Sequence, residues 1–243
     1  MDSLIPVYCL SFANSDRRRR MEDRFNQIGL SESYHFQYSI PIDDPLLEYY
    51  LRKRTEGETE HGKRLASMTV GYLSMIKQFL STDKPYGVFC EDDVHLRKNF
   101  KEDISAIIKA VESIKKPKKK PKIILLGFLS VVRPHFPLYD ESIQLINQKF
   151  KLMKYPEDVW GAQMILLSRK NAMKIIEKYD RPFHLSFPGQ SYSGDCSFTK
   201  LEPRALIYPM LGVEEGHVET KDIGQVQFHR LCHQVNYNKD EYI

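Results

Sequence analysis

The sequence predicts an α/β fold with a mostly parallel central sheet, and three observations lead to this prediction. Segments rich in β-branched and aromatic residues alternate with segments whose apolar residues recur every three or four positions. Such alternation is typical of strand–helix–strand units, whose strands run parallel. A composition of 42% hydrophobic and 28% charged residues is ordinary for a globular protein. Because the 243 residues contain no repeat and no clear linker, we expect a single domain over residues 1–243.

The chain is expected to open with a strand, a helix and a second strand. Residues 5–12 are dense in β-branched and aromatic side chains, which favours a strand. Asn14 or Ser15 is a suitable N-cap for the helix that follows, and Gly29 is a suitable stop signal. Residues 34–40 form the second predicted strand, so the chain opens as a β-α-β unit.

The next part of the chain is expected to be irregular at first and regular afterwards. Residues 43–64 are charged and show no apolar period, so we expect a mobile excursion there. A helical period begins at Thr69 and ends before Pro85, and residues 86–90 read as a short strand. Apolar residues at three- and four-residue steps predict an amphipathic helix over 104–114.

The rest of the chain continues the alternation. Residues 115–122 are lysine-rich and carry two prolines, so they cannot form the interior of a helix. The strand that follows them is expected to end at Gly127, and an irregular tail is expected after Tyr208. The remaining predicted elements are strands at 123–126, 159–167 and 205–208, hairpin strands within 143–153, and a helix over 169–179.

Charge and cysteine content exclude several classes of protein. The net charge of +4 is too small for a dedicated nucleic-acid binder, so we expect no nucleic-acid partner. The four cysteines form no CxxC pair, which argues against a zinc site or a disulfide framework and fits a reducing compartment. No stretch approaches the ~20 apolar residues of a membrane span, and no signal peptide is visible. We therefore expect a soluble cytoplasmic protein.

Three adjacent acids are the most informative feature. Glu91, Asp92 and Asp93 directly follow a predicted strand, at the edge where open α/β sheets bind their ligands. Alternation along an extended chain would place Glu91 and Asp93 on one face. Three neighbouring carboxylates repel one another, and Mn²⁺ or Mg²⁺ would relieve that repulsion and bridge to a diphosphate. The alternative is a solvated acidic turn, and the triplet alone does not decide between them.

The sequence resembles glycosyltransferase family 25, which includes bacterial lipooligosaccharide galactosyltransferases and collagen galactosyltransferase domains. The triplet with Val94 is similar to the family's E-D-D-V form of the D-x-D motif. Other similar segments occur in the family's order, at 7–10 with Asp16-Arg17-Arg18, 69–75, 160–172, 194–198 and 207–211. The resemblance implies a GT-A-like sandwich, with a nucleotide-binding part at about 1–127 and an acceptor-side part at about 128–243.

The resemblance also implies an activity: inverting, metal-dependent transfer of a hexose, galactose or glucose above all, from a UDP-sugar to a glycan or glycosylated acceptor. Asp93 and Asp92 are then the expected ligands of Mn²⁺ or Mg²⁺, with Asp92 and Glu91 also close to the nucleotide. Asp195 is the expected general base, unless it serves only to cap a short helix. His217, His229 and His233 are candidates for a further metal ligand, with His217 preferred.

Some features remain open between a functional and an ordinary role. Arg17 and Arg18 stand at the start of a helix, where cations oppose the helix dipole, so they are candidates for contact with the nucleotide; the alternative is a basic turn paired with nearby acids. Residues 115–122 read as a solvated loop, with contact to an anionic membrane surface as the alternative. Trp160 and Tyr192 can stack on sugars, but a core position is the commoner use of an aromatic.

Two other functions compete with glycosyl transfer. A nucleotidyltransferase or phosphohydrolase can use the same acidic triplet, although the chain has no GxxxxGK phosphate loop. A non-catalytic basic module can bind nucleic acid or an anionic surface through the arginine and lysine runs, and its affinity would fall steeply with salt.

Overall fold

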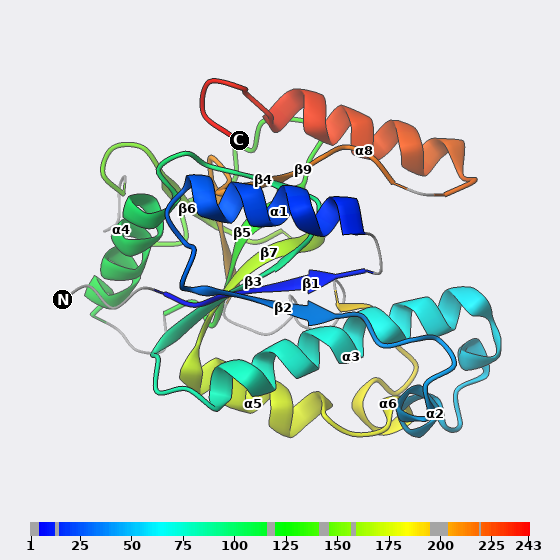
Figure 1. The fold of residues 1–243 in the computed structure, drawn as a ribbon. Coiled ribbons are helices and arrows are strands. Elements are labelled where there is room, and N and C mark those ends of the chain that lie inside the picture. Colours follow the sequence, from blue (N-terminus) through cyan, green and yellow to red (C-terminus); the bar gives the residue numbers. More distant parts are fainter. Residues whose placement is uncertain are drawn as a thin grey trace.

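A computed structural model of the protein describes residues 5–12, 15–115, 120–140, 146–156, 159–194, 204–218 and 220–243. In this part of the chain, a seven-stranded sheet has the order β2-β1-β3-β7-β5-β8-β6, and β4 pairs with β9 in a second sheet (Figure 1). The strands are β1 (Val7–Ser11), β2 (Tyr34–Tyr38), β3 (Tyr86–Glu91), β4 (Val94–Leu96), β5 (Ile123–Leu129), β6 (Lys151–Lys154), β7 (Trp160–Ser168), β8 (Arg204–Tyr208) and β9 (Gly212–Glu214). The helices are α1 (Ser15–Gln27), α2 (Pro45–Leu51), the 3₁₀ turn η1 (Thr55–Glu58), α3 (Glu60–Leu80), α4 (Phe100–Ser113), α5 (Arg169–Tyr179), α6 (Phe183–Ser186) and α8 (Ile223–Asn236).

The large sheet is mixed, with most of its strands pointing the same way. β1 runs parallel to β2 and β3, and β5 runs parallel to β8. β7 is antiparallel to both β3 and β5, and β6 is antiparallel to β8. Among the described strands of this sheet, five therefore share one direction, and β7 and β6 oppose it. The predicted α/β class with a mostly parallel sheet is confirmed.

Helices cover both faces of the sheet, as alternation along β1 requires. Val7 and Cys9 pack with α1 and α4 in one buried cluster, while Tyr8 and Leu10 pack with α3 and α5 in another. Figure 1 shows α1 and α4 on one side of the sheet and α3 and α5 on the other. One sheet also joins the two predicted parts of the chain, since β7 lies between β3 and β5.

The expectation of an irregular excursion over residues 43–64 is wrong. The segment contains α2 and η1, and α3 already begins at Glu60. Asp44 caps α2 by accepting a hydrogen bond from the Leu46 amide, and Pro45 occupies the first helical position, where its fixed φ is favourable. α2 is short, but it buries Leu47 and Tyr50 against the rest of the protein. Tertiary burial therefore stabilises a helix with little periodic signal.

The expectation of an irregular tail after Tyr208 is also wrong. The chain forms β9 and then the long helix α8, which Asp222 caps through the amides of Gly224 and Gln225. β5 likewise continues past Gly127 to Leu129, with a shift of register at Gly127. A Cβ at position 127 would lie 2.5 Å from the carbonyl oxygen of Gly212. Gly127 therefore permits β9 to approach β5 closely rather than ending the strand.

The described helices include none that is long and apolar enough to cross a membrane. Of the four cysteines, the three in the described part of the chain, Cys9, Cys90 and Cys232, are buried free thiols. Residues 116–119 of the lysine-rich segment and Cys196 lie outside the described residues.

Candidate functional site

The candidate site lies where the strand order reverses. From β1 the chain passes through α1 to β2 on one side, and through α3 it then reaches β3 on the other side of β1. The two connecting helices cover opposite faces of the sheet, α1 on one face and α3 on the other (Figure 1). Open α/β sheets bind their ligands at such a point. The predicted acidic triplet and the basic start of α1 meet here.

Asp92 and Asp93 are held together by one arginine. The Nη2 atom of Arg17 lies 2.9 Å from Oδ1 of Asp92 and also pairs with Oδ2 of Asp93. The other oxygen of Asp92, Oδ2, accepts a 3.0 Å hydrogen bond from the amide of Phe12, just beyond β1. The Asp92 side chain is fully buried and that of Asp93 is nearly so. The structure thus joins three of the predicted site residues: Arg17 from the first turn of α1, and Asp92 and Asp93 from the chain directly after β3.

Burial of this pair makes its negative charge costly. Burial raises the pKa of Asp92, although Arg17 and hydrogen bonds from its neighbours oppose the rise. For Asp93, burial and the nearby charges of Glu214, Asp92 and Glu215 outweigh Arg17 and raise the pKa to about 7. A site that destabilises its own carboxylates in this way favours a cation that binds them. Oδ1 of Asp93 is buried and accepts no hydrogen bond from the described residues.

Glu214 and Glu215 form a second acidic pair beside Asp92 and Asp93, and the sequence analysis did not single them out. The amide of Glu215 donates a 2.7 Å hydrogen bond to the carbonyl of Asp93. The Glu215 carboxylate accepts hydrogen bonds from Arg20, and it pairs with Arg24 at 2.7 Å. Although burial alone would raise its pKa, these two arginines lower it to about 2. Glu215 is therefore ionised and anchors α1 to the chain beyond β9, close to Asp93.

Two of the three candidate histidines are engaged with Glu214. Nδ1 of His229 lies 2.7 Å from both carboxylate oxygens of Glu214, and Nδ1 of His233 lies 2.8 Å from its carbonyl oxygen. Both histidines project from α8, which therefore packs against β9 beside Glu214 and Glu215. His217 is exposed, two residues beyond Glu215. The preference for His217 as a metal ligand stays a prediction.

Glu91 contacts α3, and Arg18 contacts the end of β2. The Glu91 side chain is 3.4 Å from the hydroxyl of Tyr72, on the α3 face of the sheet. β3 ends at Glu91, so strand alternation does not extend to Asp93, which contacts α1 on the other face. The expectation that Glu91 and Asp93 share a face is therefore wrong. Arg18 lies over the ring of Tyr38 at the end of β2, with 5.4 Å from its Cζ to the ring centroid.

The residues present suit a divalent cation that a ligand completes. In the part of the chain that the structure describes, no group of three or more His, Cys, Asp and Glu side chains is arranged to hold a metal. Mg²⁺ and Mn²⁺ are, however, commonly held by one or two carboxylates together with water and substrate phosphates. Asp92 and Asp93 provide such a pair of hard oxygen ligands, and the free Oδ1 of Asp93 is available to a cation.

The other candidate residues are the general base Asp195 and the aromatic residues Trp160 and Tyr192. Asp195 lies outside the described residues, so its role as base stays a prediction. Trp160 is not a core residue, because half of its surface is exposed at the start of β7. The buried positions of β7 begin at the next residue, Gly161, and continue to Leu167. Tyr192 is buried and donates a hydrogen bond to the carbonyl of Gly62. It therefore occupies a core position, the alternative to stacking on a sugar.

A comparison of the chain with models of protein families and with curated proteins found no match.

Proposed function

We propose that the protein is a metal-dependent glycosyltransferase that moves a hexose from a UDP-sugar to a glycan or glycosylated acceptor. The observation that supports this most directly is the buried Asp92–Asp93 pair, joined to Arg17 at the reversal of strand order. That position suits a nucleotide, and the paired carboxylates suit the cation that accompanies a diphosphate. The resemblance of the acidic triplet to the D-x-D motif supports the same activity, with galactose or glucose as the expected hexose.

In this proposal Asp92 and Asp93 would hold Mn²⁺ or Mg²⁺. When bound, the cation would offset the negative charge that develops on the leaving diphosphate. Arg17 pairs with the same two carboxylates in the metal-free protein, and its guanidinium has the planar donors that recognise phosphate oxygens. We propose that Arg17 contacts the diphosphate when the cation takes over its place on the carboxylates. Glu91 then lies toward the nucleoside side, on the α3 face.

The proposed chemistry is a single displacement with inversion. An acceptor hydroxyl attacks C1 of the hexose, the bond from C1 to the diphosphate oxygen breaks, and UDP leaves with that electron pair. A general base removes the proton of the attacking hydroxyl, and Asp195 is the proposed base. The small neighbours Ser193 and Gly194 leave room for an acceptor sugar beside it.

The donor site is tested by thermal unfolding with UDP, GDP or CMP, each with and without Mn²⁺. A ligand that binds only the folded protein stabilises it by about 2.7 kcal/mol at a concentration 100 times its Kd. We expect stabilisation by UDP in the presence of Mn²⁺, and little by the other nucleotides. Release of UDP from UDP-galactose or UDP-glucose then tests the reaction itself.

Three variants make this test specific. Asp93→Ala is expected to abolish the Mn²⁺-dependent stabilisation by UDP, and Arg17→Gln to weaken it. Glu60→Gln removes an exposed carboxylate on α3 and is the matched control, for which the wild-type response is expected. If no nucleotide stabilises the wild type, or if Asp93→Ala responds like the wild type, the proposed function is wrong. In that case the acidic triplet is a structural turn.

A further inference from the structure

The edge of the sheet that carries the candidate site continues past it toward β8 and β6. Trp160, the first residue of β7, pairs with Leu129, the last residue of β5. Tyr208, the last residue of β8, pairs with Lys151, the first residue of β6. Because β7 and β6 oppose the other strands, all of these positions lie at the same edge as Asp93. From β3 to β8 this edge spans three strand spacings, about 14 Å.

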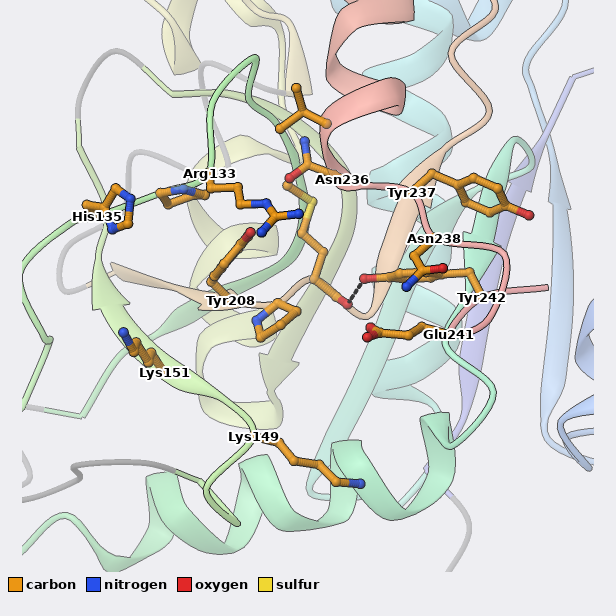
Figure 2. Close-up of a pocket in the computed structure, with 14 residues that line it drawn as sticks. Arg133, His135, Lys149, Lys151, Tyr208, Asn236, Tyr237, Asn238, Glu241 and Tyr242 are labelled. Carbon is orange, nitrogen blue, oxygen red and sulfur yellow. Dashed lines mark hydrogen bonds between the residues drawn. The ribbon is translucent and has the colours of Figure 1, made fainter.

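A cavity of about 370 Å³ opens at the far end of this edge (Figure 2). It is built by the chain after β5, the start of β6, the end of β8, the end of α8 and the C-terminal residues. Its polar lining includes Arg133, His135, Lys149, Lys151, Tyr208 and Glu241. A cavity of this size suits a small ligand held by a few polar groups.

The charge of the cavity is positive. Arg133, Lys149 and Lys151 contribute three cations, whereas Glu241 is the acidic side chain among the described residues that line it. Figure 2 shows Arg133 and Lys151 on one side and Glu241 on the other. Glu241 is paired with Arg97 at 2.7 Å, so its charge is largely neutralised within the protein. The side chains of Arg133 and Lys151 are exposed, and an anion in the cavity can reach them.

The cavity also offers surfaces that suit a sugar ring. Tyr208 is partly exposed at its wall, and an aromatic face packs well against the apolar face of a sugar. The ring of Tyr237 is instead packed against the rings of His95 and His233. Trp160 is half exposed on the same edge, between the cavity and Asp93 in the order of strands. Met210 lines the cavity and Glu215 lies beside Asp93, and the five residue steps from Met210 to Glu215 limit the distance between their Cα atoms to about 17 Å.

From these observations we propose that the cavity binds an anionic sugar, that is, a sugar unit that carries a phosphate or a carboxylate group. Arg133 and Lys151 bind the anionic group, and the ring of Tyr208 contacts the sugar. The further assignment of this unit to the acceptor, with Trp160 contacting the glycan between the two sites, rests on the proposed function. Binding in the cavity itself requires neither UDP nor a metal ion.

The methyl group of Met210 provides a local probe of the cavity. The protein is labelled with ¹³C at its methionine methyl groups, the Met210 signal is assigned with Met210→Leu, and glucose 6-phosphate or glucuronate is titrated in without UDP or metal. We expect the Met210 signal to shift at millimolar concentrations of either anionic sugar. The Met173 signal, from an exposed position on α5, should stay unchanged. Glucose and inorganic phosphate should each bind at least about tenfold more weakly, since each lacks one half of the ligand.

Charge reversal tests the roles of the cations. Arg133→Glu and Lys151→Glu are each expected to weaken binding of glucose 6-phosphate at least about tenfold, because each removes a charge-assisted contact and adds repulsion. Lys174→Glu makes the same change of charge on α5 and should leave binding unchanged. The proposal is overturned if Met210 does not respond to either anionic sugar, or if glucose or phosphate alone binds as well. Stabilisation by UDP and Mn²⁺ tests the donor site separately, so either proposal can fail alone.

Discussion

Glu215→Gln is expected to destabilise the protein by about 3 kcal/mol at pH 7. The Glu215 side chain is 15% exposed and pairs with Arg20 and Arg24, so the ionised form is strongly favoured in the folded state. Its pKa falls from 4.5 to about 2 on folding, and 1.36 kcal/mol for each unit gives about 3 kcal/mol. Loss of one partner from a buried ion pair costs about 3–5 kcal/mol, which agrees in size. Urea unfolding of both proteins measures the difference.

The pH dependence of that difference has a definite sign. Because folding lowers the pKa of Glu215, its contribution is complete above pH 4.5 and is lost as the pH falls toward 2. The gap in stability between wild type and Glu215→Gln should therefore narrow below pH 4.5. Glu60→Gln breaks an exposed pair with Arg64 and should cost less than about 0.5 kcal/mol. A cost below about 1 kcal/mol for Glu215→Gln, or a gap that persists unchanged at low pH, would refute the reasoning.

Two further predictions concern the same region. Asp93→Asn should stabilise the metal-free protein by about 2–4 kcal/mol at pH 8, because folding raises the Asp93 pKa from 3.8 to about 7. The ionised carboxylate lowers the stability of the wild type progressively as the pH rises from 4 to 7. Urea unfolding at pH 4 should therefore show almost no difference between Asp93→Asn and the wild type. An equal gain in stability at pH 4 and pH 8 contradicts this prediction. Gly127→Ala should lower stability by about 1–3 kcal/mol, because its Cβ would meet the Gly212 carbonyl at 2.5 Å. Thermal unfolding measures this, and an unchanged midpoint would show that β9 leaves room for a Cβ at position 127.

The elements with a strong local signal were predicted closely. The helix expected over 169–179 is α5 with the same bounds, and the strands expected at 34–40, 86–90 and 205–208 are β2, β3 and β8 within a few residues. In these segments the period of the apolar residues matches the burial that the fold requires. The sequence also pointed to Asp92 and Asp93 as a pair at a strand end, since their position depends on only a few neighbouring residues.

Contacts between distant parts of the chain could not be predicted in the same way. Glu215 and Arg20 are 195 positions apart, and nothing near either residue indicates that they meet. Trp160 shows the opposite error, because a core position is the commoner use of an aromatic residue, whereas its place at the sheet edge leaves it half exposed. α2 was missed because its helical signal is short and its stability comes from packing.

The sequence by itself determined the α/β class, most of the strands and helices, and the acidic pair, because local periodicity, caps and strand-end position encode them. The tertiary structure decided which partners that pair has: Arg17 on both carboxylates, Glu215 beside Asp93, and the basic cavity at the far end of the same edge. The physical reason is that charge pairing and burial depend on distances in space. Those distances are set by the spatial order of the strands in the sheet, which cannot be predicted from any short stretch of the chain.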